Sequence, residues 1–115
     1  MVCRWSPEPF HVGLPGRLQG GVIATAVICH ALWTATATAH RDEELEICEP
    51  LAFAYSTTSA HIDFLGPTPV DGSLTLRAGV VSMDQERALV ECTVAVGDRE
   101  TARSRTEHAR IPLAL

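Results

Sequence analysis

Two adjacent glycines, Gly20 and Gly21, stand directly before the longest apolar stretch of the chain. The first amides of a helix have no acceptor within the helix, and they form the positive end of its dipole. Glycine also lets a ligand approach these amides closely. Such a turn can bind and polarise a carbonyl oxygen, and one donor of this kind is worth about 3 to 4 kcal/mol in a transition state. The alternative is that the glycines only allow the helix to pack tightly in its sheet.

Few reactive side chains accompany this turn. Gln19 can donate and accept hydrogen bonds, but it cannot act as an acid or a base near neutral pH. Cys29 and His30 are consecutive, and consecutive residues of a helix point about 100° apart, so only one of them can face a given site. A neutral imidazole at His30 could activate water, whereas apolar surroundings disfavour the thiolate that Cys29 would need. His30 is the catalytic candidate, and the alternative is a core histidine with satisfied hydrogen bonds.

A second polar pair lies further along the chain. His61 and Asp63 are two residues apart in a segment that alternates apolar and polar residues, so they share one face of a predicted strand. They could form an orienting pair for a substrate. The alternative is that they are ordinary exposed polar residues of a strand.

The elements that position these residues follow from hydrophobic periodicity. The segment 22–39 carries no formal charge, and its length favours a helix that ends near residues 40–42. We interpret it as a buried core helix rather than a membrane span, because threonines and His30 interrupt it. Alternation and turn residues predict strands at residues 2–5, 56–64, 71–83, 88–96 and 101–111. The last of these strands has charged residues on one face and only small or polar residues on the other, so its contribution to a core is weak. We therefore expect an edge strand there.

Composition limits the classes of function. The chain has 115 residues, of which 46% are hydrophobic, so we expect a single domain over residues 1–115 with a short N-terminal strand. A net charge of −5 disfavours nucleic-acid binding. No basic leader precedes the apolar stretch, so we expect a cytoplasmic location with no membrane contact. The cysteines show no metal-binding or redox spacing, and reduced, mostly buried thiols are expected at Cys3, Cys29, Cys48 and Cys92.

Two stretches carry a resemblance to a known family. PGRLQGGVIATAV, residues 15–27, is similar to a Pro-Gly-x-x-His-Gly-Gly motif that leads into a central helix. FLGPTPVDG, residues 64–72, is similar to a Phe-x-Arg-Pro-x-x-x-Gly turn. In this order and separation, over nearly the whole chain, they resemble the hotdog acyl-CoA thioesterases of the phenylacetate-pathway type. The resemblance implies an α+β hotdog fold, with an antiparallel sheet wrapped around one long helix.

The chain departs from this family at two positions. Gln19 stands where the family has the histidine before Gly-Gly, and Ile28 stands where it has an aspartate or glutamate in the helix. The resemblance also extends to the hotdog 3-hydroxyacyl dehydratases, through His11, Pro15 and Gly16, but Ala26 falls where their glutamate is expected. Hydrolysis therefore ranks above dehydration.

The resemblance implies a thioester hydrolase acting on an acyl-CoA or acyl-carrier substrate. Its catalytic residues would be Gly20, Gly21, Gln19 and His30, with His61, Asp63 and Arg87 binding substrate. Coenzyme A would enter only as part of the substrate, with no separate cofactor and no metal, and its phosphates would need cations such as Arg87, Arg99, Arg103 and Arg105. The missing carboxylate leaves open a non-catalytic domain that binds acyl-CoA or another apolar ligand, or that is purely structural. A small core with an unpaired edge strand also predicts a homodimer or a dimer of dimers.

Overall fold

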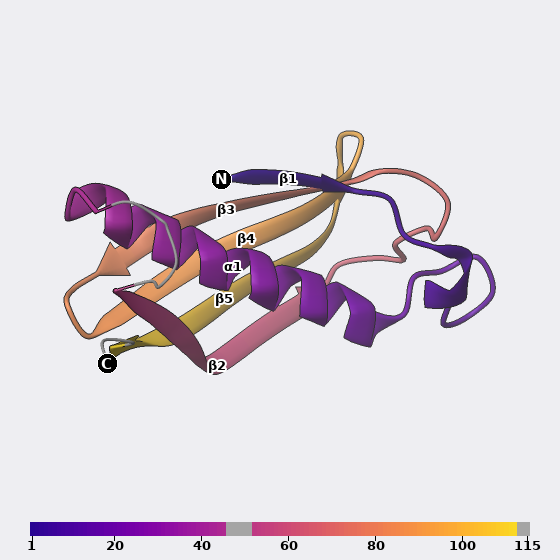
Figure 1. Cartoon of the computed structure of the whole chain (residues 1–115). Coiled ribbons are helices and arrows are strands. Elements are labelled where there is room, and N and C mark those ends of the chain that lie inside the picture. Colours follow the sequence, from indigo (N-terminus) through magenta and orange to yellow (C-terminus); the bar gives the residue numbers. More distant parts are fainter. Residues whose placement is uncertain (46–51, 113–115) are drawn as a thin grey trace.

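One long helix lies across one face of a five-stranded antiparallel sheet (Figure 1). The computed structural model describes residues 1–45 and 52–112. A short 3₁₀ helix, η1, precedes the long helix. In chain order the elements are β1 (Val2–Trp5), η1 (Pro9–His11), α1 (Gly20–Asp42), β2 (Phe53–Phe64), β3 (Leu74–Met83), β4 (Arg87–Val96) and β5 (Arg99–Pro112).

The helix α1 packs on the sheet through a stripe of mostly small side chains. Val27, Ala31 and Ala35 recur every four residues and are at most 1% exposed, which is the spacing of one helix face. Alanine at these positions lets the helix axis approach the strands closely. The hydroxyls of Thr25, Thr34 and Thr36 donate to the carbonyl four residues earlier, so they are satisfied within the helix. By length and composition α1 could cross a bilayer, but here it packs along the sheet.

The sheet has the order β1-β3-β4-β5-β2, with every neighbouring pair antiparallel. The prediction that the last strand is an edge strand is wrong, because β5 lies between β4 and β2. Its small side chains are those on which the helix packs, and Ala102, Ser104 and Thr106 are at most 3% exposed. The edges are β1 and β2.

Strand β2 begins earlier than predicted and is only partly covered. It starts at Phe53 rather than Ser56, and a bulge interrupts its pairing with β5 between Thr57 and Ser59. Beyond the bulge, Ala60, Ile62 and Phe64 pair with the buried Thr106, Ser104 and Ala102, so they share the face on which the helix lies. Yet Ala60 and Phe64 are exposed and Ile62 is half-buried, so the chain's own helix does not cover this end of β2.

The cysteines differ in their surroundings. Cys92 is buried, and burial raises the pKa of its thiol to about 11, so it stays protonated near neutral pH. Cys3 is half-buried, and Cys29 is exposed rather than buried as expected. Cys48 lies outside the described residues.

A histidine lies in the core between the helix and the sheet. His108 is 1% exposed, and its two ring nitrogens contact the hydroxyls of Thr57 at 3.0 Å and Thr106 at 2.8 Å. Burial lowers the pKa of His108 below its ordinary value of 6.5, because the charged ring would lose its hydration.

The lowered pKa of His108 predicts that the fold loses stability in mild acid. Well above pH 6.5 His108 is neutral in both the folded and the unfolded state, so it imposes no cost. As the pH falls below 6.5, the unfolded chain takes up a proton more readily than the folded one, and stability decreases. We expect the midpoint of urea unfolding to fall between pH 7.5 and pH 5, and His108→Gln to reduce that dependence. A wild-type midpoint that is constant or rises over this interval would contradict the prediction.

Candidate functional site

The start of α1 leaves two backbone donors without an acceptor. Gln19 is the N-cap residue, with extended backbone at φ −65° and ψ 135°, and its carbonyl accepts from the amides of Val22 at 3.0 Å and Ile23 at 3.2 Å. No side chain caps this end. Within residues 1–45 and 52–112, no group accepts a hydrogen bond from the amides of Gly20 or Gly21. These two N–H groups are therefore available to a ligand.

An open groove of about 450 Å³ lies at this helix start. We call it the glycine groove, and its walls include Leu14, Arg17, Gln19, Gly20, Phe64 and Pro67. A Cβ built on Gly20 would meet only the ring of Phe64, at 3.6 Å, and one built on Gly21 would meet nothing within 4 Å. Both glycines are exposed, so neighbouring side chains do not seal their amides.

The two motifs singled out in the sequence build this groove together. The loop before α1 and the loop after β2 join through backbone hydrogen bonds, from Leu18 N to Thr68 O at 2.7 Å and from Val70 N to Gly16 O at 3.2 Å. Gly16 has a φ of +73°, a left-handed conformation that favours glycine. Figure 1 shows both loops beyond the same end of the sheet. Segments about 50 residues apart thus form the walls around Gly20.

His30 does not lie beside the glycines within one chain. It is ten residues further along α1, which corresponds to about 15 Å at 1.5 Å per residue. Its Nε2 lies 3.1 Å from the carbonyl oxygen of Met1. A carbonyl only accepts, so Nε2 carries the proton and Nδ1 is the ring nitrogen that can take one up. The half-buried Ile28 occupies the helix position where the family has a carboxylate.

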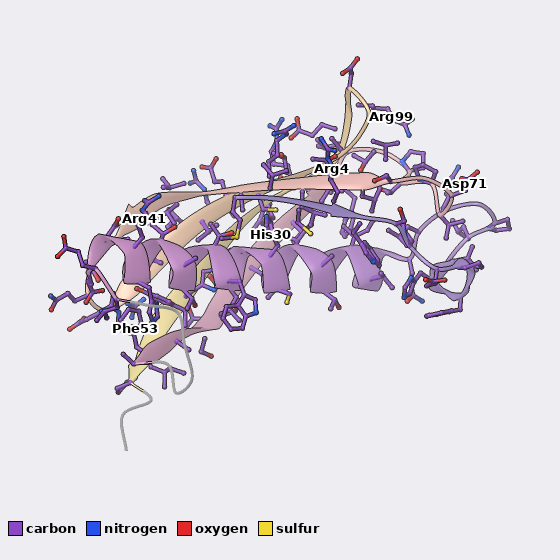
Figure 2. All side chains as sticks on the ribbon, turned by 45° about the horizontal axis from the view of Figure 1, so that its top comes forward. Arg4, His30, Arg41, Phe53, Asp71 and Arg99 are labelled. Carbon is purple, nitrogen blue, oxygen red and sulfur yellow. The ribbon has the colours of Figure 1, made fainter. Side chains whose placement is uncertain are left out.

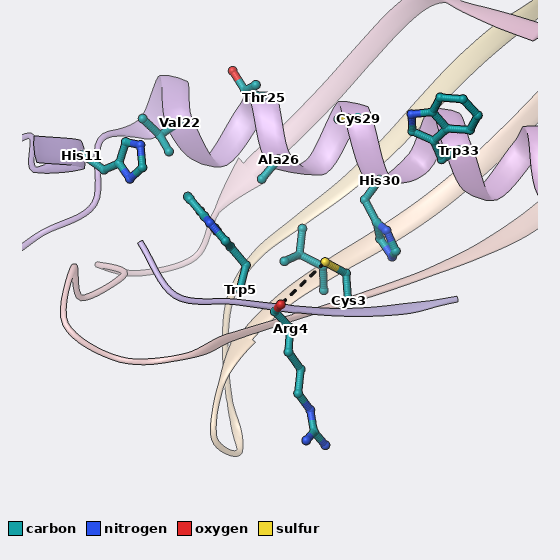
Figure 3. Close-up of a pocket in the computed structure, with 11 residues that line it drawn as sticks. Cys3, Arg4, Trp5, His11, Val22, Thr25, Ala26, Cys29, His30 and Trp33 are labelled. Atoms are coloured by element: carbon teal, nitrogen blue, oxygen red, sulfur yellow. Dashed lines mark hydrogen bonds between the residues drawn. The ribbon is translucent and has the colours of Figure 1, made fainter. Parts of the chain in front are cut away.

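His30 instead lines a second and larger cavity, between β1 and α1 (Figure 3). This tryptophan cavity has a volume of about 570 Å³, and its walls include Trp5, His11, Val22, Cys29, His30 and Trp33. Figure 3 shows the side chain of Arg4 pointing away from it. The cavity is mainly apolar, with the two indole rings among its walls.

Sequence analysis did not place His11 beside Gln19 at the start of α1. Its carbonyl accepts from the amide of Gln19 at 3.0 Å, so the two residues are neighbours despite seven intervening positions. The amide of Glu8 donates to His11 Nδ1 at 2.9 Å, which leaves the proton of a neutral ring on Nε2. The only sequence signal was the dehydratase resemblance through His11, Pro15 and Gly16.

His61 and Asp63 contact each other as their spacing suggested. His61 Nε2 lies 3.1 Å from Asp63 Oδ1, and the two side chains are 77% and 57% exposed. Their partners on the neighbouring strand β5 are Arg105 and Arg103, which lie on the sheet face away from the helix. They are therefore on the opposite side of the sheet from the glycine groove of their own chain.

Arg87 lies at the other end of the molecule from the glycines. The adjacent Glu86 accepts from the amide of Arg110 at 2.8 Å, and the Arg110 side chain binds Glu43, the C-cap of α1, at 2.7 Å. A helix of 23 residues places this end about 33 Å from Gly20. Of the arginines near the groove, Arg17 was missed by sequence analysis, although it stands inside the quoted motif.

Solved structures with this fold come from several bacteria. A thioesterase superfamily protein from Shewanella loihica is 28% identical, with 96% of this chain and 82% of that one covered at a TM-score of 0.77. A Streptococcus mutans protein bound to acetyl CoA is 15% identical, with 96% and 80% covered at a TM-score of 0.80. A hypothetical thioesterase from Streptococcus pneumoniae with coenzyme A is 12% identical, with 96% and 80% covered at a TM-score of 0.79.

Comparisons based on sequence give no further assignment. No family model matches the chain, and no curated protein matches it. The structural comparison confirms the predicted hotdog fold and, with it, the resemblance to the thioesterase superfamily.

Proposed function

Starting from the hotdog fold that the chain shares with thioesterase superfamily structures, we propose that it hydrolyses acyl thioesters of coenzyme A or of a related carrier. The observation that carries the proposal is the pair of amides at the exposed Gly20 and Gly21, which have no acceptor among the described residues and of which Gly20 lines the glycine groove. Bound coenzyme A or acetyl CoA in two structures of the same fold supports a ligand of this chemical class.

In this proposal the thioester carbonyl oxygen accepts from the amides of Gly20 and Gly21. Water attacks the carbonyl carbon, a C–O bond forms, and negative charge develops on the oxygen that the amides already contact. Collapse of this intermediate breaks the C–S bond and releases a thiol and a carboxylic acid. Gln19 stands at the N-cap, where its amide side chain can hold the carbonyl in position.

Water activation needs a base. The imidazole of His11, at this helix start, already accepts from the amide of Glu8 through Nδ1. His30 is about 15 Å from Gly20 along the helix, and its Nε2 is bound to the carbonyl of Met1 beside β1, the sheet edge opposite β2. We therefore assign this role to a group that a second copy brings to the β2 edge.

A second copy is also what the exposed part of β2 requires. This 12-residue strand has an edge with no neighbouring strand among the described residues, and its helix-side residues Ala60 and Phe64 are exposed. Antiparallel pairing of two β2 strands would satisfy both edges, and the second copy's helix would cover these residues. We therefore propose a homodimer whose sites lie at the interface. The cytoplasmic location and the lack of a separate cofactor remain predictions.

The alternative is a hotdog dimer that binds an acyl-CoA without hydrolysing it. The specific observation in its favour is Ile28, because α1 has no carboxylate before Asp42 at its end. A bound carbonyl would then be polarised without an attacking group.

Release of free thiol from a panel of acyl-CoAs of different chain length tests the proposal. Wild-type protein is expected to release thiol from at least one of them, and Gly20→Pro, which removes one of the two proposed donors, is expected to slow that release. Tight binding in calorimetry without thiol release would favour the binding alternative. Absence of both turnover and binding across the panel would leave only a structural role.

A further inference from the structure

We propose that Arg17 and Arg99 bind the phosphate at the far end of the pantetheine arm of the substrate. This inference rests on the proposed function, and it assigns the carrier end of the ligand to two residues of the glycine groove and its rim. This assignment replaces Arg87 as the proposed phosphate-binding cation, because Arg87 lies at the opposite end of α1 from Gly20.

Arg17 is fixed in the wall of the groove by its backbone. Its amide donates to Leu14 O at 2.9 Å, and its carbonyl accepts from Gly13 N at 2.8 Å. It also forms an isolated β-bridge with Pro69. It is three positions before Gly20, so the two Cα atoms are at most about 11 Å apart. The backbone of Arg17 is thus fixed near Gly20, and its exposed side chain can extend from there toward the carrier end of a ligand.

Arg99 approaches the same loop from the turn between β4 and β5. Its Nη2 donates to the carbonyl of Pro67 at 3.3 Å, and Pro67 is part of the groove wall. Figure 2 shows Arg99 at the opposite end of the sheet from Arg41 and Phe53. Arg17 and Arg99 therefore both contact the loop after β2, at Pro69 and Pro67.

Within the described residues these two cations have no anionic partner, which is also true of Arg4, Arg77 and Arg87 but not of the other four arginines. Exposed Arg103 pairs with Glu100 at 3.1 Å and Arg105 with Glu91 at 2.6 Å. Within the described ranges no carboxylate lies within 4.0 Å of Arg17 or Arg99. The positive end of the α1 dipole adds to their charge, although the chain as a whole carries −5.

A further polar group in the same wall lacks a partner. Thr68 is 2% exposed and lines the groove, and its hydroxyl has no hydrogen bond among the described residues. A buried hydroxyl left unpaired is unfavourable, and a ligand group could offset that cost. A planar guanidinium binds phosphate oxygens through paired hydrogen bonds, so phosphate is the anion that best fits this region.

Phosphate on a pantetheine arm has two sources, free coenzyme A and the phosphopantetheine of a carrier protein. One acyl group offered on three thiols shows whether this shared phosphate is contacted: coenzyme A, pantetheine 4′-phosphate and N-acetylcysteamine, which ends before any phosphate. The same acyl group on a phosphopantetheinylated carrier protein then separates the two sources. We expect Arg17→Ala combined with Arg99→Ala to raise KM for the coenzyme A thioester about 10-fold or more and to leave the N-acetylcysteamine thioester unchanged. An equal increase for pantetheine 4′-phosphate would assign the contact to the phosphate nearest the thioester.

Arg77→Ala, an exposed arginine of β3, is the matched control, and Arg87→Ala tests the cation first predicted. An unchanged KM in the double variant, an equal rise for all three thioesters, or a rise caused by Arg87→Ala alone would overturn the inference. If the wild-type protein hydrolyses no thioester, calorimetry with coenzyme A replaces KM, and the double variant is expected to bind it about 10-fold more weakly. Equal binding by both proteins, or none by the wild type, would also overturn it.

Discussion

Replacing Gly20 with proline is expected to lower kcat for thioester hydrolysis by about 100- to 1,000-fold while the fold persists. Proline removes the N–H and is tolerated at the first position of a helix. The residue before a proline must be extended, and Gln19, with ψ at 135°, already is. The substitution therefore deletes one proposed oxyanion donor with little disturbance of α1. Steady-state kinetics and circular dichroism measure the two effects.

Gly20→Ala is the matched control for this variant. Its Cβ would meet Phe64 at 3.6 Å, an ordinary contact, and it keeps the N–H. Alanine is expected to retain most of the activity and to raise helix stability slightly, by about 0.5 to 1 kcal/mol. Gly21→Pro and Gly21→Ala form the second pair. Folded proline variants at both positions with wild-type kcat would contradict the assignment of the oxyanion donors.

Replacing Ala60 with lysine is expected to convert a dimer into a monomer and to abolish turnover. Ala60 is exposed in one chain, so lysine fits the isolated subunit, but in the proposed dimer its charge would lie under the second copy's helix. An unpaired charge in an interface costs about 2 to 5 kcal/mol, which weakens association at least about 30-fold. Sedimentation against the subunit mass of 12.4 kDa measures the change.

The neighbouring residue provides the control for Ala60→Lys. Ser59 is also exposed, but it lies on the other face of β2 and pairs with Glu107 across β5. Ser59→Lys is expected to remain dimeric and active. An active wild-type monomer, or an Ala60→Lys variant that sediments as the wild type does, would contradict the proposed interface.

Much of the fold was accessible from periodicity, because its signals are local. The uncharged run after Gly21 predicted α1, and the predicted strands 2–5 and 88–96 agree closely with β1 and β4. The lateral order of strands depends on contacts between distant segments. Strand β5 was misassigned for this reason, because its small residues, such as Ala102, suggested weak burial when they in fact accommodate the helix.

The candidate site was predictable only where one local turn defines it. Gly20 and Gly21 followed from the helix start, and the contact of His61 with Asp63 followed from strand spacing. The position of Arg17 in the groove wall, and of Arg87 about 33 Å away, depends on how two loops join and which strand end meets which helix end. Spacing along the chain carries no information on either.

The most direct test is a crystal structure with a thioester analogue whose sulfur is replaced by methylene, so that the ketone cannot be hydrolysed. The account predicts the ketone oxygen within about 2.7 to 3.1 Å of the amide nitrogen of Gly20 or Gly21, in the glycine groove. An analogue seated in the tryptophan cavity, or one with no oxygen within hydrogen-bond reach of either amide, would contradict it.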